Sequence, residues 1–167
     1  MSNRTTALHA ALLIAALGSS ANALAQAAER GCIELKTVAE VEEAYLDENG
    51  NEATRLVPAS KVVPGDEVTW TIVANNVCTT PAGDVAITNP VPEHMRYVGN
   101  SAFGLGATLA FSLDGTAFAA PDALLVTEAD GSERRARADE YAYIRWVLPQ
   151  PMGPSESLIV RYRALVL

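Results

Sequence analysis

The sequence predicts an all-β protein, an antiparallel sandwich that follows an export signal. Segments of alternating apolar and polar residues recur along the chain at the strand period of two. Turn signals such as Asn49-Gly50, Asp114-Gly115 and Asp130-Gly131 separate these segments. No helical period of comparable length follows the first 25 residues. Many short strands with turns between them are typical of an antiparallel sandwich.

The first 25 residues have the three parts of a secretory signal. Arg4 supplies a positive n-region, residues 10–17 form an apolar h-region, and Ala23-Leu24-Ala25 fits the small-x-small cleavage rule. This apolar run is shorter than the roughly 20 residues that span a bilayer, and no longer one follows. We therefore expect a cleaved signal peptide over residues 1–25, no membrane span, and a periplasmic or extracellular protein.

Lipidation of Cys32, which follows Gly31, is the alternative to simple cleavage. A lipid-modified cysteine would lie directly behind the apolar run, and here Glu29 and Arg30 intervene. We favour cleavage, which leaves a short N-terminal segment over residues 26–31 and a sandwich domain over residues 32–167. About 140 residues suit one domain with its own core.

The charge balance excludes one class of partner. Without Arg4, the 12 basic residues become 11 against 20 acidic ones, a net charge of −9. Binding to nucleic acid depends on a basic surface that neutralises phosphates. We therefore expect no nucleic-acid partner.

Two cysteines remain after cleavage, Cys32 and Cys78. An even number in an exported chain favours a disulfide between them over two free thiols. On the chain-entropy account, a loop of this size stabilises the fold by roughly 4 kcal/mol. A metal or redox site is disfavoured because the chain has no Cys-x-x-Cys and one histidine after the signal, His94.

The first predicted strands form an N-terminal hairpin over residues 33–57. One face is mostly apolar and the other mostly charged, with Val38 as the exception on the charged face. The acidic turn over residues 47–52 is centred on Asn49-Gly50, and the chain returns through residues 54–57. The apolar face consists of Ile33, Leu35, Thr37, Ala39 and Val41, and the charged face of Glu34, Lys36, Glu40 and Glu42.

The same alternation predicts the remaining strands. Trp70 is expected to face the core, because it lies in phase with the apolar residues of its strand, and Val85 and Ile87 continue that apolar layer. A short strand over residues 95–98 is followed by a hairpin around Asp114-Gly115. Further strands are expected over residues 123–127 and 141–148, and a last one carries Leu158, Val160, Tyr162, Ala164 and Val166.

Several of these segments resemble the bacterial and archaeal surface repeat family catalogued as domain of unknown function 11. The similarity covers about residues 63–167. The family usually has aspartate where this chain has Asn89, so a role that needs a carboxylate there does not carry over. The segments that carry the resemblance are Pro64-Gly65-Asp66-Glu67-Val68-Thr69-Trp70-Thr71-Ile72, Asn75-Asn76, Thr88-Asn89-Pro90-Val91-Pro92, Tyr97-Val98, Phe111-Ser112-Leu113-Asp114-Gly115 and Ile144-Arg145-Trp146-Val147-Leu148.

This resemblance implies an immunoglobulin-like fold, an extracytoplasmic location and often a structural or adhesive role. It does not imply a catalytic site. Members of the family often occur as tandem arrays, whereas this chain has the length of one copy with an added N-terminal hairpin.

Two charged segments were weighed as binding sites. Residues 47–58 partly match a calcium loop, but Gly50 is fourth rather than sixth and Pro58 stands where a bidentate glutamate belongs, so we favour a solvated hairpin tip. Residues 133–137, Glu-Arg-Arg-Ala-Arg, could form an anion patch, but a run of this kind after a turn favours a solvated strand or loop.

Other candidate sites have simpler explanations. Trp70 and Trp146 could stack on a sugar, but their alternation favours the core. His94 has no second histidine after the signal, and no Gly-x-Ser-x-Gly occurs, so nothing supports a metal site or a catalytic triad.

We therefore expect a non-enzymatic module of the cell envelope without a cofactor. It would bind an envelope protein or polymer through an exposed strand edge, for which the hairpin of residues 33–57 is the candidate. A self-assembling surface fibre subunit and a carbohydrate-binding or hydrolytic domain are the alternatives. The sequence leaves the partner and the oligomeric state open.

Overall fold

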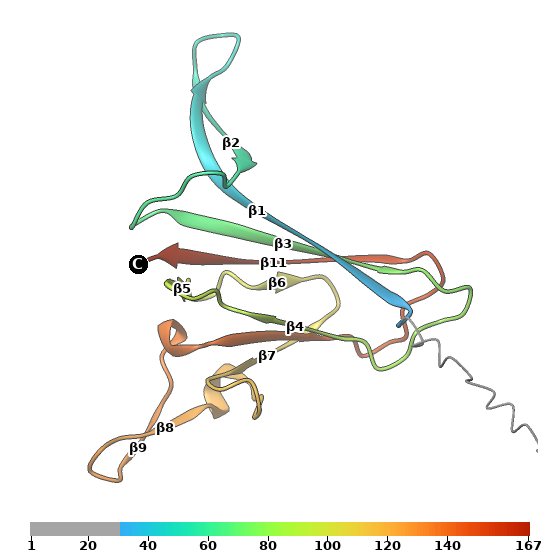
Figure 1. The fold of residues 1–167 in the computed structure, drawn as a ribbon, viewed down its shortest axis with the longest axis vertical. Coiled ribbons are helices and arrows are strands. Elements are labelled where there is room, and N and C mark those ends of the chain that lie inside the picture. Colours follow the sequence, from blue (N-terminus) through green and yellow to red (C-terminus); the bar gives the residue numbers. More distant parts are fainter. Residues whose placement is uncertain (1–30) are drawn as a thin grey trace, which may run out of the picture. The chain divides into compact units, whose positions relative to one another are not determined.

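The computed structural model describes residues 31–167, which form two facing antiparallel sheets (Figure 1). The larger sheet has the order β2-β1-β3-β11-β5, with β6 also beside β11, and the smaller sheet has the order β4-β10-β7. Strands β8 and β9 form a separate hairpin. The predicted all-β antiparallel sandwich is confirmed. The predicted signal peptide and residues 26–30 lie outside the described residues.

The strands follow the sequence pattern closely. Two 3-10 turns, η1 (Pro121–Ala123) and η2 (Ala138–Glu140), are the helical elements of the described chain. The strands are β1 (Ile33–Leu46), β2 (Glu52–Pro58), β3 (Glu67–Asn76), β4 (Ala86–Pro90), β5 (Met95–Tyr97), β6 (Phe103–Gly104), β7 (Thr108–Ser112), β8 (Leu125–Thr127), β9 (Glu133–Arg135), β10 (Tyr143–Val147) and β11 (Ser157–Val166).

The core lies between the two sheets, where period-two alternation buries one face of each central strand. Trp146 of β10 is fully buried, as predicted. Trp70 of β3 also points inward; it is partly buried and stacks on Tyr162 with ring centroids 6.3 Å apart. Around these rings pack Ile72, Ala74, Ile87, Ile144, Val160 and Ala164.

The strand β4 belongs to the sheet opposite β3. Val85 and Ile87 are buried, as the apolar pattern requires, but they face the core from the smaller sheet, because β4 pairs with β10. Between β3 and β4 the chain crosses from one sheet to the other, where Ala82 bridges to Met152. The apolar pattern gave the side of the strand that is buried but not the sheet that carries it.

The position of the last strand distinguishes this sandwich from constant-type immunoglobulin domains. In those domains the last strand lies in the sheet opposite the first two strands. Here β11 pairs with β3 along its whole length, in the middle of the larger sheet. The chain therefore has the two-sheet sandwich architecture with a strand order of its own.

The predicted N-terminal hairpin is confirmed, and it extends past the sandwich. Residues Ile33 to Val41 of β1 pair with β3, whereas Glu40 to Leu46 pair with β2. Figure 1 shows the β1–β2 hairpin projecting from one end of the larger sheet, away from the smaller sheet. The hairpin is therefore a continuation of β1 without a second layer above it.

Candidate interaction surfaces

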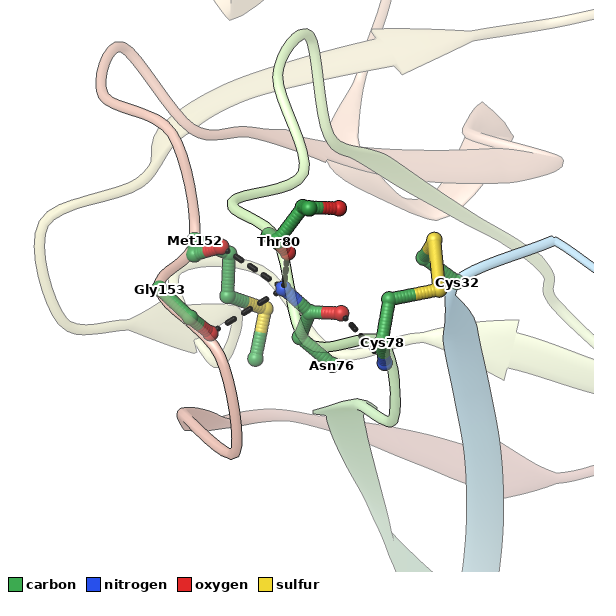
Figure 2. Close-up of a disulfide and its surroundings, with 6 residues drawn as sticks. All are labelled: Cys32, Asn76, Cys78, Thr80, Met152 and Gly153. Atoms are coloured by element: carbon green, nitrogen blue, oxygen red, sulfur yellow. Dashed lines mark hydrogen bonds between the residues drawn. A yellow bond between two sulfur atoms is a disulfide. The ribbon is translucent and has the colours of Figure 1, made fainter.

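The disulfide between Cys32 and Cys78, predicted from the sequence, fastens the start of β1 to the end of β3 (Figure 2). The two Cα atoms are 5.1 Å apart, and the bridge closes a sequence separation of 46 residues. The backbone N–H of Val77 also donates to the carbonyl oxygen of Cys32. The N-terminal strand is therefore held in the larger sheet by a covalent bond and by its hydrogen-bond ladder.

A buried asparagine braces the same end of the sandwich. The side-chain amide of Asn76 donates to the carbonyl oxygens of Thr80, Met152 and Gly153, at 2.9 to 3.1 Å (Figure 2). Its side-chain oxygen accepts from the backbone N–H of Cys78. Asn76 continues the inward-facing series of β3, so strand parity alone could have identified it as a buried polar residue.

The hairpin tip is ordered by Asp47. The side-chain oxygens of Asp47 accept hydrogen bonds from the backbone N–H groups of Asn49 and Asn51 and from the side-chain amide of Asn51. These hydrogen bonds hold the pKa of Asp47 below its usual range. Gly50 has a φ of +79°, which glycine adopts without strain.

This geometry is that of a turn stabilised by its own aspartate. The Asp47 carboxylate is already engaged by its own turn, and Pro58 lies at the far end of β2. Within residues 31–167, no group of three or more histidine, cysteine, aspartate or glutamate side chains is placed to hold a metal ion.

The two faces of the projecting hairpin differ in chemistry. On the face continuous with the core side, Arg55 forms an ion pair of 2.6 Å with Glu43 and lies 5.1 Å from the ring centroid of Tyr45. On the other face, Leu46 and Leu56 are 67% and 40% exposed. The projecting hairpin therefore exposes apolar side chains to solvent and has no core of its own.

The hairpin is also strongly acidic. Between residues 42 and 57 there is one basic side chain, Arg55, and five acidic ones: Glu42, Glu43, Asp47, Glu48 and Glu52. At its base, Glu42, Asp66 and Glu67 line a hollow of about 310 Å³ together with Arg163, which is paired with Glu67 at 2.7 Å. The hairpin thus combines exposed leucines with an excess of negative charge.

A second candidate surface is the open side of the sandwich between β1 and β4. Ile33 and Leu35 of β1, Val85 directly before β4, and Ile87 of β4 line a groove of about 410 Å³ there. Leu35 lies on the predicted apolar face, opposite the buried Ala74, yet it is 54% exposed. The apolar face of β1 is open at Leu35, because the smaller sheet has three strands and does not extend over β1 there.

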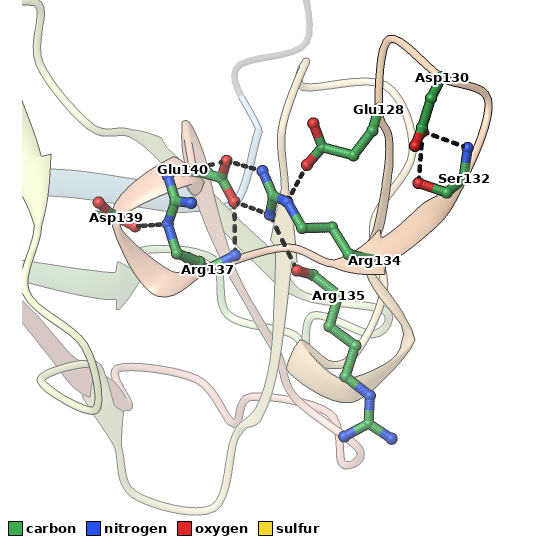
Figure 3. A network of polar contacts seen from close by, with 8 residues as sticks. All are labelled: Glu128, Asp130, Ser132, Arg134, Arg135, Arg137, Asp139 and Glu140. Atoms are coloured by element: carbon green, nitrogen blue, oxygen red, sulfur yellow. Dashed lines mark hydrogen bonds and ion pairs between the residues drawn. The ribbon is translucent and has the colours of Figure 1, made fainter.

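The arginine-rich run after Asp130-Gly131 is internally neutralised (Figure 3). Arg134 of β9 donates to Glu128 and to both carboxylate oxygens of Glu140. Arg137 donates to Asp139 at 3.1 Å. Hydrogen bonds from the Arg134 side chain and from the backbone N–H of Arg137 lower the pKa of Glu140 to about 2. The run predicted to be a solvated strand or loop is strand β9 and the segment leading into η2, and its charges tie the β8–β9 hairpin to η2.

The remaining sequence candidates have structural roles. His94 adopts a φ of +62°, and its carbonyl oxygen accepts from the backbone N–H of Leu167. Asn89 donates its side-chain amide to the Tyr162 hydroxyl at 2.8 Å, and burial of Tyr162 raises the pKa of that hydroxyl. The Tyr162 hydroxyl itself donates to the Pro90 carbonyl oxygen at 3.2 Å, so it accepts from the Asn89 amide.

Aromatic side chains gather at one further hollow. Tyr97, Phe111 and Tyr141 line a depression of about 260 Å³, with ring centroids 4.6 to 5.9 Å apart. All three side chains are buried against one another. Their faces are therefore engaged in core packing and do not form an open platform for a sugar ring.

Comparison of the chain with protein-family models, with curated proteins and with solved structures gave no match. The similarity to the surface repeat family therefore stays a prediction from the sequence motifs. The part of the chain that the structure describes contains no helix with the length and hydrophobicity needed to cross a bilayer.

Proposed function

We propose that the protein is a non-catalytic structural or adaptor module of the cell envelope that binds a protein or polymer partner through the β1–β2 hairpin. The observation that carries this proposal is the projection of the hairpin beyond the sandwich with both faces uncovered. An isolated two-stranded hairpin is at best marginally stable in water. Leucines exposed on such an element favour a role in contact with another molecule over a role in packing.

Strand pairing is the mode of binding that this hairpin favours. Residues Ala53, Arg55 and Val57 of β2 pair their backbone groups with β1, so those of Glu52, Thr54 and Leu56 point outward. An extended segment of a partner could add to this edge by main-chain hydrogen bonds. Leu46 and Leu56 would supply apolar contact, and the surrounding acidic side chains would favour a segment with basic residues.

The disulfide and the N-terminal sequence support the proposed location. Disulfides such as that between Cys32 and Cys78 persist in oxidising compartments, and the N-terminal sequence has the parts of a secretory signal. A periplasmic or extracellular site is therefore part of the proposal.

The alternatives receive less support. The disulfide anchors β1 in its own sheet, which disfavours a fibre built by exchange of the N-terminal strand between copies. The buried aromatic rings disfavour a sugar platform. Retention on a glycan array or turnover in a hydrolase screen would reverse this ranking in favour of a carbohydrate-binding or hydrolytic domain.

The test is photo-crosslinking in intact cells from single positions of a tagged protein, followed by mass spectrometry. We expect probes that replace Leu46 or Leu56 to capture one envelope component. A probe that replaces Leu125, which is 51% exposed on the β8–β9 hairpin, is the matched control and should not capture it. Equal capture from all three positions, or no adduct from the hairpin, would refute the proposal.

A further inference from the structure

The root of β1 carries an unused strand edge that is distinct from the hairpin. Even-numbered residues of β1 pair their backbone groups with β3, as the hydrogen bond from Val77 N–H to Cys32 O shows. Because ladder bonds alternate along an antiparallel strand, the backbone N–H and C=O groups of Ile33, Leu35 and Thr37 point away from β3. The β2 strand begins to pair farther along, at Glu40, so no strand within residues 31–167 pairs with this edge. We call these three residues the β1 free edge.

We propose that the β1 free edge pairs with the same edge of a second copy of this chain, antiparallel and centred on Leu35. A two-fold axis at Leu35 places Leu35 opposite Leu35 of the second copy, and Ile33 opposite Thr37. All three pairs then join residues whose backbone groups point outward, so each pair can exchange two hydrogen bonds. Such a contact is isologous and closes as a dimer.

Charge complementarity selects this register. On the outer face of β1, centring on Leu35 places Glu34 opposite Lys36 of the second copy, and this happens twice by symmetry. Centring one residue earlier would place Glu34 opposite Glu34, and centring one residue later would place Lys36 opposite Lys36. Like charges directly opposite each other are unfavourable, so the neighbouring two-fold registers are disfavoured.

The apolar groove supplies the second contact. Leu35 is 54% exposed beside a groove of about 410 Å³ that it lines with Ile33, Val85 and Ile87. A second copy added to this edge would extend the larger sheet over the open side of the sandwich. Its own Leu35, on the inner face like the first, would then cover this groove and lose contact with water.

The dimer and the proposed partner site use different segments of β1. Pairing with the second copy occupies residues 33–37, whereas β2, which carries the proposed partner edge, pairs with β1 between Glu40 and Leu46. The dimer would therefore present two hairpins, and loss of the dimer would leave each hairpin able to bind. The dimer and the partner-binding proposal can fail separately.

Sedimentation of the purified protein over a concentration series tests the dimer by charge reversal. We expect Glu34→Lys and Lys36→Glu each to weaken dimerisation about tenfold, because either change converts two attractive pairs into two repulsive ones. The double variant Glu34→Lys/Lys36→Glu restores opposite charges and should regain most of the affinity. A monomer at every concentration, or a dimer indifferent to these changes, would overturn the proposal.

Cysteine trapping tests the register. A pair opposed through hydrogen bonds has Cα atoms about 5.5 Å apart, within the range that a disulfide bridges. Under mild oxidation Leu35→Cys should therefore give a covalent dimer. Thr37→Cys is the control with the same added thiol on the same edge, and its two copies would lie more than about 13 Å apart along the paired strands. Equal trapping of both variants, or no trapping at Leu35, would contradict the Leu35-centred pairing.

Discussion

In the sandwich, Ile72, Trp146 and Val160 are at most 1% exposed, whereas in the hairpin Leu46 and Leu56 are 67% and 40% exposed. Both regions consist of antiparallel strands with alternating side chains. The difference is that the sandwich strands have a second sheet facing them and the hairpin has none. The two regions show that alternation gives a strand its two faces, while stability comes from what covers one of them.

The two regions should therefore respond very differently to truncation of an aromatic side chain. Trp146→Ala removes a fully buried indole whose N–H donates to the Phe103 carbonyl oxygen, and we expect a loss of about 3–5 kcal/mol in the free energy of unfolding. Tyr45→Ala in the hairpin removes an exposed ring in contact with Arg55 and should cost less than about 1 kcal/mol. Urea unfolding followed by circular dichroism measures both. Similar losses for the two variants would show that the hairpin is part of the cooperative core.

Removal of the disulfide should affect the first half of β1 more than its second half. The double variant Cys32→Ala/Cys78→Ala frees a loop with a sequence separation of 46 residues and should lower the unfolding free energy by about 2–4 kcal/mol. Amide exchange should quicken first in residues 33–38, which are fastened by the bridge. Unchanged exchange there, with a normal unfolding midpoint, would mean that the hydrogen-bond ladder with β3 alone holds the strand.

Asn76 and Asn51 allow a buried side-chain amide in the sandwich to be compared with an exposed one in the hairpin. Asn76→Ala leaves three buried or partly buried carbonyl oxygens and the Cys78 N–H without their side-chain partner, so we expect a loss of about 1–3 kcal/mol. Asn51→Ala removes an exposed contact of 3.2 Å with Asp47 at the hairpin tip and should change the unfolding free energy by less than about 0.5 kcal/mol. Thermal unfolding of both variants measures the contrast. An equal shift in Tm would contradict it.

The smallest predicted effect is a dependence of the free energy of unfolding on pH in the acid range. Because Arg134 holds the pKa of Glu140 at about 2, below its usual 4.5, the native state binds fewer protons than the unfolded state between these values. The stabilisation is present above pH 4.5 and is lost as the pH falls towards 2. Glu140→Gln should flatten the fall in stability over this interval, measured by urea unfolding at several pH values. Glu48→Gln at the hairpin tip is the control and should leave the slope as it is.

Much of the fold could be predicted from local pattern. Residues 67–76 and 157–166 alternate for most of their length, with Val73, Ile159 and Leu165 as apolar exceptions on the polar face, and both form long central strands. The turns at Gly50, Gly115 and Gly131 all adopt positive φ, which only glycine accepts readily. The bridge between Cys32 and Cys78 was predicted from an even cysteine count in a chain with a predicted export signal.

The candidate surfaces were predicted in part. The hairpin over residues 33–57 and its acidic tip were predicted correctly, but the exposure of Leu35 was not predicted. Its alternation is that of a core residue, and the signal that it stays open lies in another part of the chain, in the short strands of the smaller sheet. Strand parity could have identified Asn76 as buried. Its hydrogen-bond partners Met152 and Gly153 could not be predicted in this way, because they are 76 and 77 residues away in the sequence.

Most of the strands, their turns, the apolar side of each strand and the cysteine pair could be predicted, because they depend on neighbours along the chain. Only the folded structure shows that β4 joins the opposite sheet, that β11 lies beside β3, and that β1 extends beyond the smaller sheet. These outcomes depend on contacts between distant segments and on the width of each sheet. The apolar face of a strand is buried only where a strand of the opposing sheet extends over it.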